Sequence, residues 1–177
     1  MRFAEAPLAG AWVVDPDRLG DERGHFARTF DRDEFAARGM ASEIVQCSAS
    51  YNARAGTLRG LHFQCDPHGE PKLVRCTRGA VFDVIVDLRP GSATHRAWYG
   101  VELSADNGRA LYVPPGMAHG FQTLQDGSEL LYMMSHEYVP AAASGVRWDD
   151  PAFGIEWPAV AERVMSERDR RYPDYAA

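Results

Sequence analysis

The segment AVFDVIVDL, at positions 80–88, constrains the fold more than any other part of the chain. Its residues alternate between two faces and many are β-branched, which indicates a β-strand. One face carries Phe82, Val84, Val86 and Leu88, and the other carries Val81, Asp83, Ile85 and Asp87. Because the second face mixes acids with apolar residues, we expect it to line a barrel interior or a pocket.

Further short strands are predicted on both sides of this segment. The candidates are residues 73–77, 98–103, 110–113 and 129–134. Turn-forming residues separate them, at positions 89–92, 105–108, 114–116 and 125–128. Arg78-Gly79, just before the central strand, predicts a hairpin-like turn. Many short, evenly spaced strands indicate a β-sandwich or a β-barrel.

The helical signal is limited to two segments. Asp31–Arg38 has acids at its start and predicts a short capped helix, and Val160–Arg171 predicts a second helix near the C-terminus. No long linker, low-complexity tract or internal repeat divides the chain. We therefore expect one domain, residues 1–177, that is mostly β with two short helices.

Composition excludes several classes of protein. With 45% hydrophobic and 25% charged residues, the chain is not mostly disordered. Its net charge of −6 argues against general nucleic-acid binding. We find neither a signal peptide nor the roughly 20 apolar residues of a membrane span. Cys47, Cys65 and Cys76 lack the spacing of a zinc site, so we expect reduced thiols in a cytoplasmic protein.

Two histidines stand in segments that hold side chains rigidly. His62 lies in RGLHFQ (59–64), where strand alternation predicts Arg59 on one face and His62 on the other. His119 lies in PPGMAHGF (114–121), with proline and glycine around it. A histidine on a strand suits general base catalysis, because its pKa is close to neutral. A hydrogen-bonded structural histidine and a plain turn are the alternatives.

Two histidines in a small β-barrel raise the question of a metal. Metal-binding cupin barrels usually supply an HxH pair, and here Gln64 stands where the second histidine would be. We therefore predict no bound metal.

Cations gather in the same part of the chain and suggest an anionic ligand. They are Arg54, Arg59, Lys72, Arg75 and Arg78, and Lys72 is the only lysine. Arginine suits phosphate oxygens, so one ligand such as a diphosphate is expected, with a solvated strand face as the alternative. Tyr132 lies in an apolar strand, where its phenol either donates a single hydrogen bond or donates a proton across a pocket.

These segments together resemble the dTDP-4-dehydrorhamnose 3,5-epimerase family. The matching motifs, in chain order, are DERGHF (21–26), RGLHFQ (59–64), KLVRC (72–76), DVIVDLR (83–89), AHGF (118–121), WDDP (148–151), IEWP (155–158) and SERD (166–169). The resemblance implies a metal-free, cupin-like jelly-roll β-barrel without a cofactor. It also implies a homodimer, in which the first segment of each chain crosses to the other, and a nucleoside-diphosphate 4-keto-6-deoxyhexose as substrate.

The resemblance also implies roles for individual residues. His62 matches the base, Tyr132 the acid, and Asp169 the carboxylate paired with the base. Asp83 matches the partner of His119, and Lys72 matches the lysine near the keto oxygen of the sugar. The substrate-binding positions are Arg23, Phe26, Arg28, Gln46, Cys47, Ser48, Arg59, Lys72, His119, Tyr138 and Arg168.

The chain also departs from the family pattern. Arg28 stands where a glutamate is common near the nucleotide base, residues 141–143 are alanines where a glutamate often occurs, and Met133 replaces a frequent lysine. Arg168 replaces a lysine and keeps the charge. The identity of the nucleotide and the number of inverted carbons therefore stay open. A sugar-nucleotide 3,4-ketoisomerase and a non-catalytic sugar-nucleotide binding barrel are the alternative functions.

Overall fold

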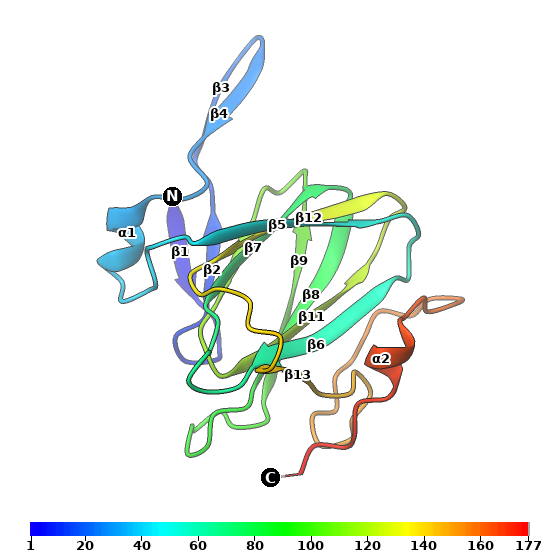
Figure 1. Ribbon diagram of the computed structural model, residues 1–177. Helices are drawn as coiled ribbons and strands as arrows, with labels where there is room; N and C mark the ends of the chain where they lie inside the picture. Colours follow the sequence, from blue (N-terminus) through cyan, green and yellow to red (C-terminus); the bar gives the residue numbers. More distant parts are fainter. Residues whose placement is uncertain (177) are drawn as a thin grey trace.

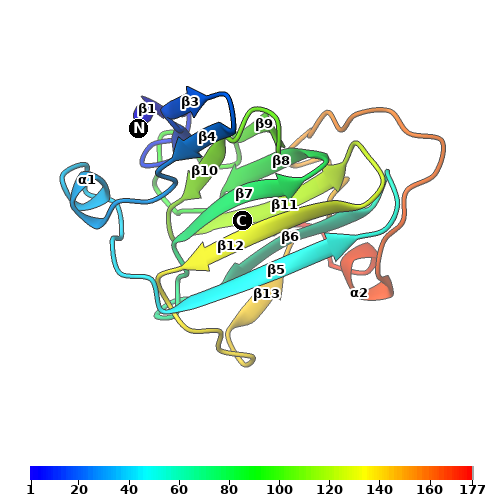
Figure 2. The ribbon, with the colours of Figure 1, turned by 90° about the horizontal axis from the view of Figure 1, so that it is seen from above.

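Two antiparallel sheets face one another in the computed structural model, which describes residues 1–176 (Figures 1 and 2). The elements are β1 (Arg2–Glu5), β2 (Trp12–Asp15), β3 (Arg18–Asp21), β4 (Gly24–Ala27), α1 (Arg32–Ala36), β5 (Gln46–Asn52), β6 (Leu58–Gln64), β7 (Lys72–Arg78), β8 (Ala80–Asp87), β9 (Trp98–Ser104), β10 (Ala110–Val113), β11 (Met117–Thr123), β12 (Ser128–Met134), β13 (Ala143–Gly145) and α2 (Glu167–Arg170). The larger sheet has the order β1-β2-β10-β7-β12-β5, the smaller one β13-β6-β11-β8-β9, and β3 pairs with β4 alone. The prediction of a mostly β chain is confirmed, and the facing sheets are consistent with a jelly roll.

The alternation predicted for β8 is confirmed. Val81 and Ile85 pack between the two sheets, in one cluster with Leu111 of the larger sheet. Val84 points the other way and packs in a second cluster with Phe153 of the C-terminal segment, which covers the outside of the smaller sheet. Each such side chain contributes roughly 1.5–3 kcal/mol when it is buried. The two faces of one strand thus join the sheets to each other and to the C-terminal segment.

The hairpin predicted at Arg78-Gly79 is wrong. β7 pairs with β10 and β12 in the larger sheet, whereas β8 pairs with β9 and β11 in the smaller one. The chain therefore crosses between the sheets at Gly79, which has φ +71°. A Cβ atom there would lie 2.5 Å from the Ser128 hydroxyl, so the crossing requires glycine.

The first predicted helix is confirmed. Asp31 caps the N-terminus of α1, where its side chain accepts hydrogen bonds from the N–H groups of Asp33 and Glu34. Phe35 is buried and packs α1 on the outer face of the larger sheet, in a cluster that includes Tyr112.

The second predicted helix is wrong over most of its length, because only Glu167–Arg170 is helical. Val164 instead exchanges backbone hydrogen bonds with Gly56 and Leu58, so this part of the chain is extended. Neither helix of the described residues has the length and apolar character needed to cross a membrane.

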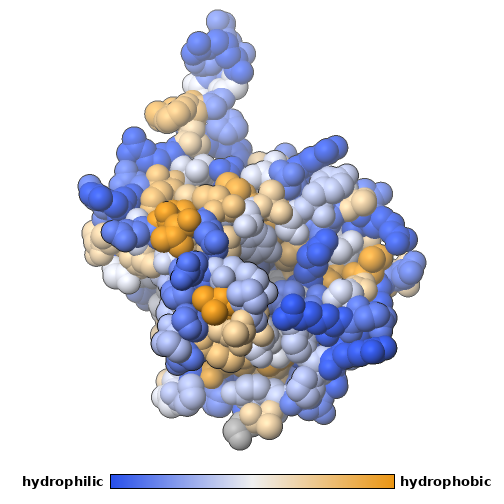
Figure 3. Space-filling model, viewed as in Figure 1, coloured by the Kyte–Doolittle hydropathy of each residue, from blue (hydrophilic) through white to orange (hydrophobic). Residues whose placement is uncertain are grey.

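The β3–β4 hairpin stands away from the rest of the molecule (Figures 1 and 3). Its tip is hydrophilic, as Figure 3 shows, but its two strands also carry large apolar side chains. Leu19 and Phe26 are paired across the hairpin and are 71% and 69% exposed. An arm with this exposed apolar pair has no core of its own within one chain.

Candidate active site

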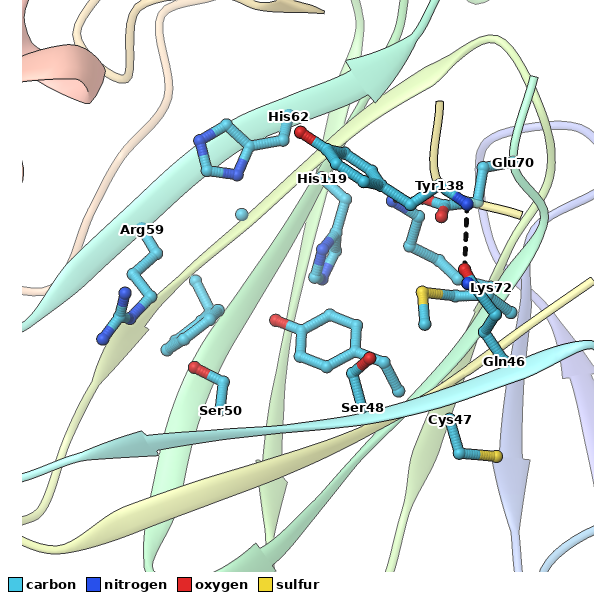
Figure 4. A pocket seen from close by; sticks show the side chains of 14 residues that line it. Gln46, Cys47, Ser48, Ser50, Arg59, His62, Glu70, Lys72, His119 and Tyr138 are labelled. Carbon is cyan, nitrogen blue, oxygen red and sulfur yellow. Dashed lines mark hydrogen bonds and ion pairs between the residues drawn. The ribbon is translucent and has the colours of Figure 1, made fainter. Parts of the chain in front are cut away.

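A cavity of about 620 Å³ lies between the two sheets (Figure 4). β5 and β12 of the larger sheet form one wall, and β6 and β11 of the smaller sheet form the other. The lining residues are Gln46, Cys47, Ser48, Ser50, Arg59, His62, Glu70, Lys72, His119, Gly120, Phe121, Tyr132, Met134 and Tyr138.

His62 forms a hydrogen bond with a buried carboxylate behind it. Its Nε2 lies 2.8 Å from Oδ1 of Asp169, which comes from α2. Burial raises the pKa of Asp169, but the hydrogen bonds from His62, the Gly60 N–H and the Ser166 hydroxyl outweigh it, so the net pKa is below the usual value. A carboxylate that stays ionised here fixes the orientation of the imidazole.

A second histidine–aspartate pair lies deeper in the same wall. Nε2 of His119 is 2.8 Å and 3.0 Å from the two carboxylate oxygens of Asp83. Complete burial raises the pKa of Asp83, although the nearby His119 and Lys72 oppose this rise. His119 therefore presents a fixed ring to the cavity, opposite Tyr132, whose ring centroid is 5.8 Å away.

Tyr132 faces this wall from the larger sheet. Desolvation, followed by the charge of Asp83, raises its pKa well above the usual value for a phenol. The hydroxyl therefore stays protonated at neutral pH and is able to act as a proton donor. His62 and Tyr132 belong to opposite sheets and line the same cavity.

Two cations are held in the cavity by partners from other residues. Lys72 Nζ lies 2.8 Å from a carboxylate oxygen of Glu70, and the two side chains are each only 9% exposed. Arg59 Nε donates a 2.8 Å hydrogen bond to the side-chain oxygen of the buried Asn52. Both partners favour a single position of the cation, which suits the binding of anionic oxygens.

Chemically, the arrangement combines a base, an acid on the opposite wall and two cations around one cavity. That set suits removal of a proton from one side of a ligand and delivery of a proton from the other. No group of three or more His, Cys, Asp or Glu side chains placed to hold a metal is found among residues 1–176.

The sequence matches the family model described as dTDP-4-dehydrorhamnose 3,5-epimerase over residues 5–177. The chain belongs to this family. It is 43% identical over 173 residues to the dTDP-4-dehydrorhamnose 3,5-epimerase of Sinorhizobium fredii, with 98% of this chain and 89% of that protein aligned. It is 40% identical to a Streptomyces niveus protein named dTDP-4-dehydrorhamnose 3-epimerase, with coverages of 96% and 82%. The crystal structure of the Bacillus anthracis 3,5-epimerase, with TDP and PPi bound, has a TM-score of 0.94 at 40% identity and coverages of 98% and 99%.

The structure brings together most of the site residues predicted from the sequence and the family. Arg59, His62, Lys72, His119 and Tyr132 line the cavity, and so do Gln46, Ser48 and Tyr138. Asp83 and Asp169 lie behind the two histidines. Arg168 lies beside a smaller adjoining cavity of about 120 Å³. Tyr138 follows the end of β12, and its N–H donates to the Gln46 side chain.

Other predicted residues lie apart from the cavity. Arg23 and Phe26 are on the projecting hairpin, where Arg23 pairs with Asp21. Arg28 pairs with Asp31, the N-cap of α1. Cys47 borders the cavity, but its side chain points away from the other labelled groups in Figure 4.

The alternation predicted for residues 59–64 is wrong, because Arg59 and His62 both line the cavity. Between the two positions β6 has one residue more than β11: His62 faces His119, but Arg59 faces Phe121. Such a bulge returns both side chains to one face. Gly60 permits it, with φ +121° and Gly120 Cα only 2.6 Å from where a Cβ would stand.

Two residues of the site were missed from the sequence. Glu70 precedes β7, and Asn52 ends β5, and neither belongs to a motif that we singled out. The lone lysine was the available signal for Glu70, because a buried ammonium needs a carboxylate partner. Nothing in the sequence pattern predicts the Asn52–Arg59 contact.

Proposed function

We propose that this chain epimerises C3 and C5 of a nucleoside-diphosphate 4-keto-6-deoxyhexose, with dTDP-4-dehydro-6-deoxyglucose as its substrate. The names of its relatives support the reaction and the nucleotide. The observation that carries the proposal is the placement of His62 and Tyr132 on opposite sheets around one cavity. We expect the enzyme to work in the cytoplasm, where thiols such as the exposed Cys65 stay reduced.

The chemistry follows from the 4-keto group, which acidifies the hydrogens on C3 and C5. His62, oriented by Asp169, takes one of these protons, and the electron pair moves onto the oxygen at C4 to give an enolate. Lys72 and His119 stabilise the negative oxygen as preformed donors do for other oxyanions. Tyr132 then gives its proton to the carbon from the opposite side, which inverts the centre, and recovers a proton from solvent.

Other residues bind the nucleotide in this proposal. Arg59, held by Asn52, contacts the diphosphate, and Gln46 and Ser48 contact the nucleoside. Arg23 and Phe26 reach the cavity of a second copy of the chain, because the β3–β4 hairpin that carries them stands away from the rest of its own molecule. The functional unit is then a homodimer, and covering Leu19 and Phe26 contributes to its formation.

The test is incubation of the protein in deuterated water with 4-keto-6-deoxyglucose linked to dTDP, UDP, GDP or CDP. NMR of the sugar should show deuterium at C3 and C5 with inverted configuration, fastest for the dTDP sugar. Exchange at C3 alone would indicate a one-centre epimerase, as the name of the S. niveus relative states for that protein. A 3-keto product would indicate a ketoisomerase.

Two variants test the roles that the proposal gives to His62 and Tyr132. His62→Asn should lower the rate of exchange by about 10³–10⁴-fold. Tyr132→Phe should allow deuterium to enter with retained configuration, because protons then return only through His62. A folded protein that binds dTDP but exchanges no hydrogen in any of the four sugars would overturn the proposal.

A further inference from the structure

Among residues 1–176, Glu70 is the one acidic side chain that lines the main cavity. Its carboxylate lies 2.8 Å from Lys72 Nζ, and both side chains are almost fully withdrawn from water. In Figure 4 the two residues lie together on one side of the cavity. They also line the adjoining small cavity, together with His62 and Tyr138, so the pair stands where the two spaces meet.

A buried ammonium without a partner is costly, and Glu70 forms the one ion pair that Lys72 has among residues 1–176. The other nearby acid, Asp83, is already hydrogen-bonded to His119. Lysine also has a flexible four-carbon stem with three rotatable donors. Without Glu70, the stem has no polar contact to hold its end in one place.

We infer that Glu70 is a positioning residue for Lys72. The ion pair with Glu70 holds the ammonium in one place and leaves donors for the oxygen at C4 that becomes negative in the enolate. This inference rests on the proposed function, since it assigns a geometry to the same step. It requires a hydrogen-bond acceptor at position 70, so an uncharged acceptor should serve in part.

The experiment is a double-mutant cycle on deuterium exchange, with Glu70→Met, Glu70→Gln and Lys72→Met. Methionine removes the acceptor at similar length, whereas glutamine keeps an oxygen that accepts from Lys72. We expect Glu70→Met to lower kcat about 10- to 100-fold, as loss of an orienting partner does at other sites. Glu70→Gln should recover most of that loss. KM and dTDP affinity should change by less than about threefold, because uniform binding is not affected.

The effect of Glu70→Met in the Lys72→Met background tests whether Glu70 acts through Lys72. Lys72→Met alone should cost about 10²–10³-fold in kcat, and adding Glu70→Met to it should change kcat by less than about twofold, because the two residues act as one unit. Equal losses from Glu70→Met in both backgrounds, or a Glu70→Met protein with wild-type kcat, would overturn the inference. Glu102→Gln, on an exposed side chain of β9, is the matched control and should resemble wild type.

Foldedness and the proposed function are tested separately in the same series. Binding of dTDP and a cooperative melt show that each variant is folded, and Glu70→Asp replaces Glu70→Met in the cycle if that variant fails either test. Absence of exchange in the wild-type protein contradicts the proposed function. Wild-type exchange that Glu70→Met leaves unchanged contradicts the inference alone.

Discussion

The two histidine–aspartate pairs have the same composition but different access to water. His62 and His119 face one another directly across β6 and β11, and each has a carboxylate oxygen 2.8 Å from Nε2. The His62 side chain is 45% exposed, whereas that of His119 is 4% exposed. Asp169 reaches His62 from a helix near the C-terminus, while Asp83 lies on the strand beside His119.

Burial separates the chemistry of the two pairs. The pKa of Asp169 falls below its usual value because hydrogen bonds outweigh its desolvation. The pKa of Asp83 rises because complete burial dominates. The exposed pair therefore suits a base that exchanges protons with substrate and solvent, and the buried pair suits a fixed donor. The same two residue types, histidine and aspartate, are therefore suited to different roles in the two pairs because their exposure to water differs.

The largest expected effect comes from removing the exposed imidazole. His62→Asn should lower kcat for deuterium exchange by about 10³–10⁴-fold, at the upper end for general bases, because it removes the proposed base. His119→Asn should cost about tenfold less, since Lys72 still stabilises the enolate. Both rates are measured by NMR in deuterated water. A larger loss for His119→Asn would reverse the assignment of the two pairs.

Asp169→Asn should lower kcat about 10- to 100-fold and leave KM nearly unchanged, because the carboxylate orients His62 without lining the cavity. The measurement is steady-state kinetics of epimerisation. Glu167→Gln is a matched control on the same short helix, where Glu167 is exposed and pairs only with Arg171 among the described residues. A loss expressed mainly in KM would mean that Asp169 contacts substrate.

Asp83→Asn should mainly affect stability. It alters the hydrogen-bond partner of a buried histidine, so we expect the free energy of unfolding to fall by about 1–3 kcal/mol. Urea unfolding at fixed protein concentration measures the loss. Asp106→Asn, at an exposed turn, is the control and should change stability by less than about 0.5 kcal/mol. Equal stability of the two variants would show that the buried pair is not needed for folding.

The smallest expected effect is that the stabilising contributions of Asp169 and Asp83 change in opposite directions with pH. Asp169 has a lowered pKa in the folded protein, so its stabilisation is present above the ordinary value of 3.8 and is lost as pH falls through the folded value. Asp83 has a raised pKa, so its contribution is present below 3.8 and is lost as pH rises through the folded value. The stability deficits of the two asparagine variants should therefore change in opposite directions between pH 3 and 7, by roughly 1.4 kcal/mol per unit of pKa shift. Parallel changes would contradict this.

The local sequence pattern predicted where the strands lie better than it predicted which strands pair with one another. The alternation of residues 80–88 assigns Val81 and Val84 to opposite faces correctly, but it contains no information on which sheet β7 joins. The crossing at Gly79 depends on Ser128, which is far away in the sequence. The segment before α2 was predicted as helix because its pairing with Gly56 is a tertiary contact.

The site was predictable where residue type alone suggests chemistry. The residue types of His62 and His119 predicted acid–base chemistry, and those of Arg59 and Lys72 predicted an anionic ligand. The family resemblance supplied Asp169 as the partner of His62. Strict alternation of side chains along a strand does not allow for a bulge such as the one in β6, so Arg59 was assigned to the wrong face. Glu70 and Asn52 were missed because their roles exist only through contacts with a cation from another strand.

The His62–Asp169 contact joins residues 107 positions apart. All the strands that wall the cavity are complete by Met134, and the last segments then run along the outside of the smaller sheet to deliver the carboxylate (Figure 1). During synthesis, the strands that form the cavity walls are therefore complete before the carboxylate that contacts His62 is made. Under the proposed function, loss of the segment that carries Asp169 would leave the cavity walls in place but remove the partner that orients His62.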